Sequence, residues 1–256
     1  MSVLDTFSLQ GKVALVTGAS QGLGQAMAVG LAAAGADIAG LDRTPDCADT
    51  CEQVEALGRR FMNLSVDLLA ASADDLNDVV GEIVDTLGRL DILVNNAGII
   101  RRAPALDFAE KDWDDVIDIN QRAVFFMSQA VGRVMKEQGS GKIINVASML
   151  SFQGGILVPS YTASKSAVAG LTRALANEWA PLGINVNAIA PGYMATANTA
   201  PLRADPVRSK AILERIPAGR WGDPEDLQGV VVFLASDAAS YLYGAIIPVD
   251  GGWLAR

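Results

Sequence analysis

The chain has 256 residues, half of them hydrophobic, and a formal net charge of −9. This length and apolar content allow one α/β domain of ordinary size or two small ones. The negative charge argues against nucleic acid and an anionic membrane surface as partners. Without histidine, and with Cys47 and Cys51 as its only cysteines, the chain lacks the ligands and bases for a Ser-His-Asp triad, a Cys-His dyad or a His/Cys zinc site. We therefore expect no metal.

Two charge-free stretches, residues 13–36 and 143–164, are long enough to span a bilayer. Both contain glycines, serines and amide side chains, which fit a buried strand, a tight loop and a helix better. The first residues also lack the basic and then apolar pattern of a signal peptide. We expect a soluble, cytoplasmic protein.

Short apolar runs alternate with longer amphipathic segments along most of the chain. Because most of these runs are continuously apolar, they predict strands of a parallel sheet that is covered on both faces. The predicted strands are residues 13–16, 37–41, 61–66, 92–94, 142–146, 185–189 and 246–249. The predicted helices are residues 23–34, 48–58, 73–87, 111–138, 161–180 and 224–236. This order predicts a single Rossmann-type, doubly wound α/β domain over residues 1–256, with about seven strands and helices on both faces.

Residues 191–206 form an irregular region rich in proline, glycine, threonine and alanine, and a short helix is predicted at 207–214. Because this region follows the sixth predicted strand, we expect residues 191–215 to form a mobile lid over an active site. A passive surface connection is the alternative.

A glycine-rich turn follows the first predicted strand. Gly18, Gly22 and Gly24 would let the backbone approach a pyrophosphate, whose charge is met by the N-terminus of the next helix. Asp42 ends the second predicted strand, where a carboxylate can accept hydrogen bonds from a ribose diol and repel a 2′-phosphate. Asp42 favours NAD over NADP, although the guanidinium of Arg43 could recruit the phosphate.

Further cofactor contacts are predicted in the same turn and after the next strands. Gln21 stands where a basic residue could have bound a phosphate, which again favours NAD. Asp67 is placed to reach the adenine, unless it is a simple turn or cap aspartate. The small residues at 95–98, after the fourth strand, would let the cofactor lie close to the backbone. The remaining predicted contacts in these segments are Ser20, Leu23, Leu68, Asn95, Ala97 and Gly98.

Tyr161 and Lys165 are four residues apart, so on a helix they would share one face, one turn apart. An ammonium group beside a phenol favours the phenolate, which lowers the pKa of the tyrosine from its usual value of about 10. Tyr161 would then be a usable proton donor and acceptor. Ser148, at the end of a predicted strand, could hydrogen-bond the same substrate oxygen. These residues suit proton transfer at a carbonyl or an alcohol.

The glycine turn, residues 95–98, Ser148 and the Tyr161–Lys165 pair occur in the order that resembles the classical short-chain dehydrogenase/reductases, over essentially the whole chain. The resemblance implies that the tyrosine is the acid and base, that the serine polarises the substrate oxygen, and that the lysine lowers the phenol pKa and binds the nicotinamide ribose. It implies that Asn120 binds a water of the proton relay, although this residue could also be a polar interruption that bends a helix. It further implies a homotetramer, and a segment beside the nicotinamide that contains Pro191, Gly192, Met194 and Thr196.

Residues 99–102, 148–155, 191–196, 216–222 and 249–256 further resemble gluconate dehydrogenase-like members of the family, which interconvert a secondary alcohol and a ketone on a sugar acid with NAD(H). A sugar acid carries a carboxylate, and Arg101 or Arg102 could bind it through paired hydrogen bonds. An exposed charge pair or a subunit contact is the alternative for both arginines. Besides Ser148, the predicted substrate contacts include Gln153 and Tyr193.

Two other functions remain open. An NADPH-dependent 3-oxoacyl-[acyl-carrier-protein] reductase would share every catalytic motif. Because a carrier protein is acidic, that enzyme would benefit from a basic docking patch, which the charge of −9 disfavours. A catalytically idle nucleotide-binding or regulatory protein is the second alternative, and the complete set of catalytic residues argues against it.

Overall fold

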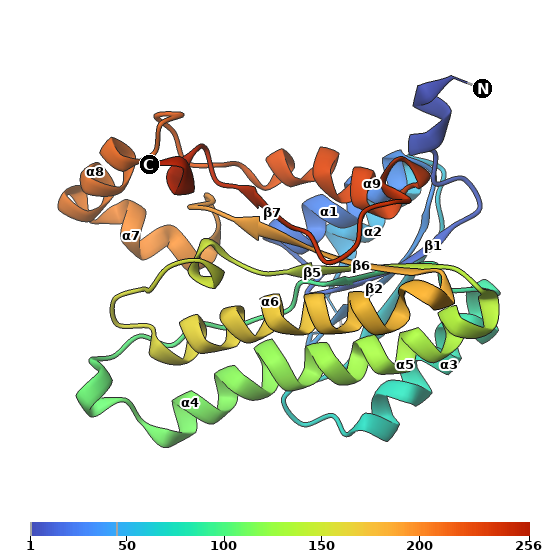
Figure 1. Ribbon diagram of the computed structural model, residues 1–256, viewed down its shortest axis with the longest axis horizontal. Helices are drawn as coiled ribbons and strands as arrows, with labels where there is room; N and C mark the ends of the chain where they lie inside the picture. Colours follow the sequence, from blue (N-terminus) through green and yellow to red (C-terminus); the bar gives the residue numbers. More distant parts are fainter. Residues whose placement is uncertain (1, 45) are drawn as a thin grey trace.

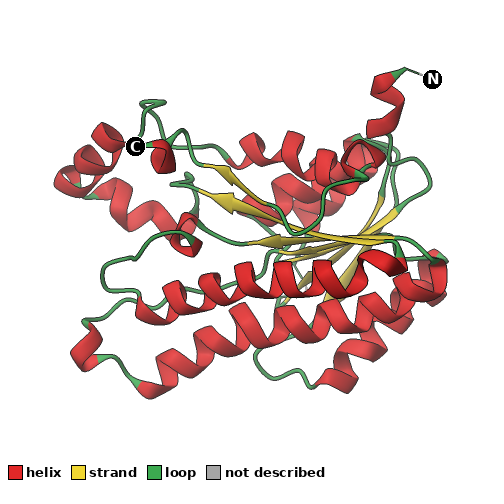
Figure 2. Ribbon diagram, viewed as in Figure 1, coloured by secondary structure: helices red, strands yellow, loops and turns green. Residues whose placement is uncertain are grey.

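The computed structural model describes residues 2–44 and 46–256. Seven strands form one parallel sheet in the order β3-β2-β1-β4-β5-β6-β7, with helices on both faces, which confirms the predicted fold class (Figure 1; Figure 2). The strand order reverses between β1 and β4, the position at which doubly wound sheets bind ligands. The strands are β1 (Val13–Thr17), β2 (Asp37–Asp42), β3 (Phe61–Ser65), β4 (Ile92–Asn95), β5 (Gly141–Val146), β6 (Ile184–Pro191) and β7 (Ile246–Val249).

Every predicted helix is present, but two are divided and one further helix appears. The predicted helix at 111–138 is interrupted by a π-helical turn at Asp118–Arg122, and the one at 224–236 begins with a 3-10 turn at Pro224–Leu227. The further helix is α7, which the sequence did not predict because it is only five residues long and has a proline in its first turn. The helices are α1 (Gly22–Ala33), α2 (Ala48–Ala56), α3 (Ala73–Leu87), α4 (Glu110–Ile117), α5 (Ala123–Gln138), α6 (Pro159–Trp179), α7 (Ala200–Ala204), α8 (Pro206–Arg215) and α9 (Gln228–Ala235).

The sheet is buried between two helical layers. Helices α3, α5 and α6 cover one face, and α1, α2 and α9 cover the other (Figure 1). Along β1, Val13 and Leu15 pack into the first layer, whereas Ala14 and Val16 pack into the second. Because successive side chains of a strand point to opposite faces, this burial explains the continuous apolar runs. None of the helices in the described part of the chain is long and apolar enough to cross a membrane.

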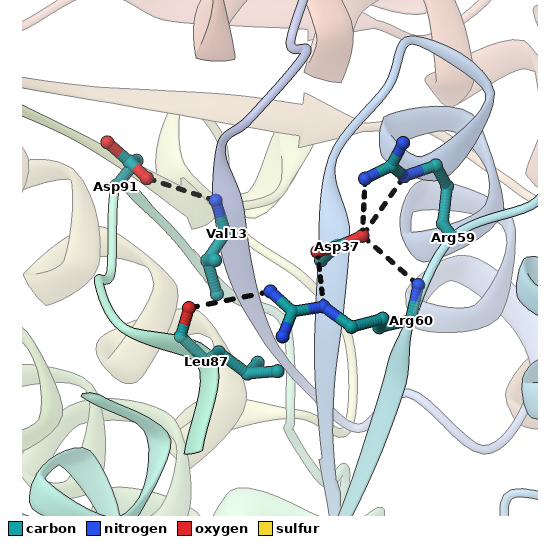
Figure 3. Close-up of polar contacts among 6 residues, drawn as sticks. All are labelled: Val13, Asp37, Arg59, Arg60, Leu87 and Asp91. Atoms are coloured by element: carbon teal, nitrogen blue, oxygen red, sulfur yellow. Dashed lines mark hydrogen bonds and ion pairs between the residues drawn. The ribbon is translucent and has the colours of Figure 1, made fainter. Parts of the chain in front are cut away.

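Two buried aspartates stabilise the amino ends of the central strands, at the edge of the sheet opposite the carboxyl ends. Asp37, the first residue of β2, accepts hydrogen bonds from Nη2 of Arg59 and Nε of Arg60, each at 2.7 Å (Figure 3). Asp91, just before β4, accepts one from the main-chain N–H of Val13 at 3.0 Å. Burial raises the pKa of Asp37, but the hydrogen bonds from Arg60 and Arg59 outweigh it, so this pKa lies below its usual value.

Replacing this carboxylate should destabilise the protein. Asp37→Asn should lower the free energy of unfolding at pH 7 by about 2 kcal/mol, because it removes charge-assisted hydrogen bonds to two guanidinium groups. The folded-state pKa is lowered, so the contribution is complete above the unfolded-state pKa of about 3.9 and disappears as the pH falls through the folded-state value. Urea unfolding should therefore show a difference from wild type that is constant between pH 7 and about pH 5 and shrinks as the pH falls below about 3.9.

The control for this variant is Asp114→Asn, which changes an exposed aspartate of α4. Its free energy of unfolding should match that of wild type within about 0.5 kcal/mol. An equal loss in the two variants, or a loss for Asp37→Asn that does not depend on pH, would contradict the role assigned to Asp37.

Candidate active site

A cleft of about 420 Å³ opens at the carboxyl ends of the strands, beside the glycine turn that follows β1. The predicted cofactor residues that line it are Gly18, Gln21, Gly22, Leu23, Asp42, Arg43, Asp67, Leu68, Ala97, Gly98, Tyr161, Lys165 and Thr196. Arg101, predicted at the substrate, also lines it. The lining residues that the sequence did not single out are Leu41, Val66, Leu69, Asn96, Ile99, Ile119, Val146, Ala197 and Asn198.

At Gly18 and Gly24 the glycine turn leaves no room for a side chain. A Cβ atom on Gly24 would lie 1.9 Å from the main-chain oxygen of Gly18, and one on Gly18 would lie 2.9 Å from Nδ2 of Asn96. Gly18 and Gly22 also have φ values of 68° and 59°, in the left-handed region that favours glycine. The N-cap of α1, Gln21, makes no side-chain capping hydrogen bond. The first N–H groups of α1 are therefore available to an anion in the cleft.

The carboxylate of Asp42 is fixed by its neighbours at the end of β2. Its Oδ2 accepts hydrogen bonds from Oγ and N of Ser20 at 2.6 and 3.2 Å, and its Oδ1 accepts one from the main-chain N–H of Arg43 at 2.7 Å. Ser20 thus holds Asp42 rather than lining the cleft itself. Asp67 lines the cleft and also accepts a hydrogen bond from the main-chain N–H of Leu69 at 3.0 Å, so its turn-capping role is confirmed.

Asn95 does not reach the cleft, contrary to the prediction. It is 3% exposed, and its Nδ2 donates to Oγ of Ser128 and Oδ1 of Asn145, both at 2.9 Å. Asn145 in turn donates to Oγ1 of Thr172 at 3.0 Å. This buried ladder joins α5, β4, β5 and α6, with partners that lie far away along the chain. The residue that faces the cleft is Asn96, whose Nδ2 donates to the main-chain oxygen of Thr17 at 2.9 Å.

Four more predicted cofactor residues lie outside the cleft lining because they are packed elsewhere. Gly24 packs against the glycine turn, and Pro191 is buried as the last residue of β6. A Cβ atom on Gly192 would lie 2.6 Å from Cα of Asp250, and Met194 is buried. These residues shape the backbone around the cleft, and Thr196 is the member of this segment that lines it.

Ser148, Tyr161 and Lys165 meet at the end of β5. Ser148 follows that strand by two residues and is buried, and Pro159 starts α6, so that Tyr161 and Lys165 lie one turn apart on it. Nζ of Lys165 donates to the main-chain oxygen of Val146 at 2.6 Å and lies 5.7 Å from the centroid of the Tyr161 ring. As predicted, Tyr161 and Lys165 therefore share one face of α6, and Ser148 lies just after the end of β5.

Burial controls the titration of both groups on α6. It lowers the pKa of Lys165 to about 8. It also raises the pKa of Tyr161, against the opposing effects of a hydrogen bond with Ser148 and the charge of Arg102. The prediction that Lys165 lowers the phenol pKa below its usual value is wrong for this structure, because lost solvation of the phenolate outweighs the nearby charges. This raised pKa favours the proton-donor form of Tyr161.

Asn120 lies in the π-helical turn and is buried, which confirms the predicted interruption of the helix. Its Oδ1 accepts from the main-chain N–H of Ile99, and its Nδ2 donates to the main-chain oxygen of Ile99, both at 2.9 Å. Nδ2 also donates to Oγ of Ser164 at 3.2 Å. The side chain therefore ties this turn both to the segment after β4 and to α6. Such π-helical turns occur often at functional sites.

The two arginines after β4 have different partners. Arg101 forms ion pairs with Asp112 and Asp115, at N–O distances of 3.3 and 3.9 Å. Arg102 is exposed and donates one hydrogen bond, to the main-chain oxygen of Asn198 at 3.3 Å. Its positive charge also opposes the rise in the pKa of Tyr161 that burial causes. Arg102 is thus the arginine whose charge is not already compensated by a carboxylate.

The other two predicted substrate residues belong to a cluster of aromatic and polar side chains. Oε1 of Gln153 accepts hydrogen bonds from Nη2 of Arg215 at 3.3 Å and Nε1 of Trp253 at 3.2 Å. The ring of Tyr193 packs edge-on against Trp253 and Trp221, with centroid distances of 4.8 and 5.5 Å. These aromatic rings pack in one apolar cluster with Tyr161.

Comparison with known proteins places this geometry in a family. The model of the short chain dehydrogenases matches residues 12–207. The protein belongs to this family. Two relatives named 2-dehydro-3-deoxy-D-gluconate 5-dehydrogenase, from Dickeya dadantii and Escherichia coli K12, are 63% and 62% identical over 255 residues, which cover 99% of this chain and 100% of each relative.

A solved structure from Agrobacterium tumefaciens has the same fold. It is provisionally described as a 2-deoxy-D-gluconate 3-dehydrogenase and contains bound NADP. The two chains are 57% identical, with a TM-score of 0.91 over 98% of this chain and 100% of the other.

As a short-chain dehydrogenase, the protein uses a nicotinamide dinucleotide, NAD(P), and its own residues fit that cofactor. The close contacts at Gly18 and Gly24 require glycine in the turn that a pyrophosphate would approach. The uncapped N–H groups at the start of α1 belong to the same turn and could bind the pyrophosphate. The Asp42 carboxylate, at the end of β2, could accept hydrogen bonds from the ribose. Tyr161 and Lys165 line the same cleft.

The two adjacent asparagines should respond differently to truncation. Asn95→Ala should lower the free energy of unfolding by about 2 kcal/mol, because it leaves buried polar partners unsatisfied, and should not change NADH affinity. Asn96→Ala should weaken NADH binding about fivefold, because it releases the glycine turn, with a smaller effect on stability. Urea unfolding and fluorescence titration with NADH measure both. Weaker NADH binding by Asn95→Ala at unchanged stability would restore its cofactor role.

Proposed function

We propose that the protein is an NAD(H)-dependent 2-dehydro-3-deoxy-D-gluconate 5-dehydrogenase, which interconverts a secondary alcohol and a ketone at C5 of a sugar acid. The full-length identity of 62–63% to two enzymes of that name carries the proposal. The site supports it, because a complete set of acid–base residues lies near an arginine that can pair with a carboxylate.

In the proposed reaction the bound nucleotide supplies or accepts the hydride. For reduction, the phenol of Tyr161 gives its proton to the carbonyl oxygen, which Ser148 holds by a hydrogen bond. For oxidation, the phenolate of Tyr161 takes the hydroxyl proton, and the hydrogen bond with Ser148 and the charge of Arg102 stabilise it. We assign the further relay of this proton to Lys165 and to a water at the π-helical turn of Asn120.

The preference for NAD over NADP is part of the proposal. Asp42 supports it, since Ser20 and the main chain of Arg43 hold its charge where a 2′-phosphate would lie. The guanidinium of Arg43 is exposed at the rim of the same cleft and is the group that would admit NADP. Cofactor preference thus depends on the Asp42 carboxylate, which hydrogen bonds hold in place, and on the exposed guanidinium of Arg43 beside it.

Residues 191–215, which include α7 and α8, form the proposed substrate lid. The hydrogen bond from Arg102 to the main-chain oxygen of Asn198 supports this role, because it links the arginine proposed to bind substrate to this segment. The homotetramer and the cytoplasmic location stay predictions.

A substrate panel tests the function. We expect reduction of NAD⁺ with 2-dehydro-3-deoxy-D-gluconate, with kcat/KM for NAD⁺ at least about tenfold above that for NADP⁺, the size of one unfavourable charge contact. Gluconate and an acetoacetyl thioester complete the panel, the thioester with NADH and with NADPH. Turnover of the thioester alone, with NADPH, would replace the proposal by the carrier-protein reductase function. Absence of any turnover would favour the regulatory protein.

Removal of the catalytic hydroxyl should separate chemistry from binding. Tyr161→Phe should lower kcat about 1000-fold, because general acid–base catalysis is lost, while NADH affinity by fluorescence titration stays within twofold of wild type. Tyr241→Phe is the control, since the Tyr241 side chain is almost fully exposed. Turnover of Tyr161→Phe near that of wild type would exclude the proposed mechanism.

The two arginines should contribute unequally to substrate binding. Arg102→Ala should raise KM for the sugar acid about tenfold or more, because a carboxylate loses its charge-assisted partner. Arg101→Ala should raise it much less, because its guanidinium is already paired with Asp112 and Asp115. Steady-state kinetics at saturating NAD⁺ compare them. A larger effect of Arg101→Ala would reverse this assignment.

A further inference from the structure

A second set of side chains, remote from the cofactor end of the cleft, joins three segments that are far apart in the sequence. We call Gln153, Arg215 and Trp253 the Trp253 cluster. Gln153 follows the 3-10 turn at Met149–Ser151 after the catalytic serine, Arg215 ends α8, and Trp253 starts a 3-10 turn near the end of the chain. Figure 1 shows α8 and this last turn beyond the same end of the sheet.

The hydrogen bonds of Gln153 decide the orientation of its amide. Its two partners, the indole N–H of Trp253 and the guanidinium of Arg215, can donate hydrogen bonds and cannot accept them. The amide oxygen, and not Nε2, must therefore face these partners. Nε2 makes no hydrogen bond within residues 2–44 and 46–256 and is not among their buried unsatisfied atoms. Gln153 consequently offers only its two N–H donors to any other molecule.

The same contacts hold the end of α8. The guanidinium carbon of Arg215 lies 3.9 Å from the centroid of the Trp253 ring, and Trp253 is 5% exposed. Such stacking on tryptophan is the strongest form of the cation–π contact. Nη2 of Arg256 also donates to the main-chain oxygen of Glu214 at 2.6 Å. The last turn of α8 is therefore fastened to the segment around Trp253.

We propose that Trp253 and Arg215 are positioning residues, which fasten α8 and turn Gln153 so that it donates hydrogen bonds to an acceptor oxygen of the substrate. The substrate class rests on the proposed function, because a sugar acid supplies carboxylate and carbonyl oxygens. Tyr193 links this cluster to the site, since its ring contacts Trp253 and belongs to the same apolar cluster as Tyr161. The substrate end of the site thus offers the donors of Gln153 and Arg102 to the oxygen-rich part of the molecule.

The chain offers a matched pair of tryptophans for the test. Trp253→Phe keeps a ring on Arg215 and Tyr193 but removes the N–H donor to Gln153. Trp221→Phe is the control, because Trp221 also packs against Tyr193 while its indole N–H donates no hydrogen bond in the described part of the chain. Trp253→Phe should raise KM for 2-dehydro-3-deoxy-D-gluconate about fivefold, as expected for one lost hydrogen bond, with kcat and NADH affinity within twofold. Trp221→Phe should leave all three unchanged.

Gln153→Glu separates the orientation of the amide from the fastening of α8. A carboxylate would still accept from Trp253 and Arg215, so the melting temperature should not fall, but it would present a negative oxygen to the substrate. KM for the sugar acid should therefore rise about tenfold or more, because a hydrogen bond to the substrate is replaced by repulsion between two negatively charged oxygens. KM within twofold of wild type in Gln153→Glu, or equal effects of Trp253→Phe and Trp221→Phe, would overturn the proposal.

A second readout does not depend on the substrate. Amide hydrogen exchange in Pro206–Arg215 should be about tenfold faster in Trp253→Phe than in wild type or Trp221→Phe, because one of the contacts that fasten α8 is weakened. If wild type turns over no sugar acid, the proposed function fails. In that case, equal amide exchange in wild type, Trp253→Phe and Trp221→Phe overturns the inference as well. Faster exchange in Trp253→Phe alone would still support the role of Trp253 in fastening α8.

Discussion

The hydrogen bond from Nζ of Lys165 to the main-chain oxygen of Val146, at 2.6 Å, connects α6 to the strand that precedes Ser148. Val146 is the last residue of β5, Ser148 follows it by two residues, and Tyr161 lies one turn before Lys165 on α6. The relative positions of Ser148, Tyr161 and Lys165 therefore depend on this contact. Lys165 is 4% exposed, and no carboxylate shields its charge, so burial lowers its pKa to about 8.

The two edges of the sheet use charged groups in opposite ways. At the amino ends of the strands, Asp37 and Asp91 are buried with guanidinium groups and main-chain donors around them, which stabilises the fold. At the carboxyl ends, Lys165 is buried and forms no ion pair among the described residues, where Arg102 likewise binds only a main-chain oxygen. Uncompensated groups of this kind have perturbed pKa values and are available to substrates, which is typical of functional sites.

The sequence predicted those features that depend on neighbours along the chain. The seven strands, the glycine turn and the one-turn spacing of Tyr161 and Lys165 follow from local periodicity and from glycine geometry. The interruption at Asn120 was also visible, as a polar residue inside an apolar helical pattern, although its π-helical form was not. Such features require no knowledge of the tertiary contacts.

Features that depend on distant partners were missed or assigned wrongly. Asn95 was predicted at the cofactor because it lies in the segment after the fourth strand, whereas its position in the structure depends on Ser128, 33 residues away. The difference between Arg101 and Arg102 depends on α4, and the orientation of Gln153 depends on Trp253, 100 residues later. The raised pKa of Tyr161 depends on burial, which motif spacing does not report.

Direct titration of Lys165 tests the account most sharply. Proteins with ¹³C-labelled lysine side chains would be followed by NMR between pH 6 and pH 11, and the Lys165→Met spectrum would assign the signal. The account predicts that Lys165 titrates near the value of about 8 set by its burial. Titration at the ordinary lysine value of about 10.4 would contradict the buried, unshielded ammonium on which the site geometry depends.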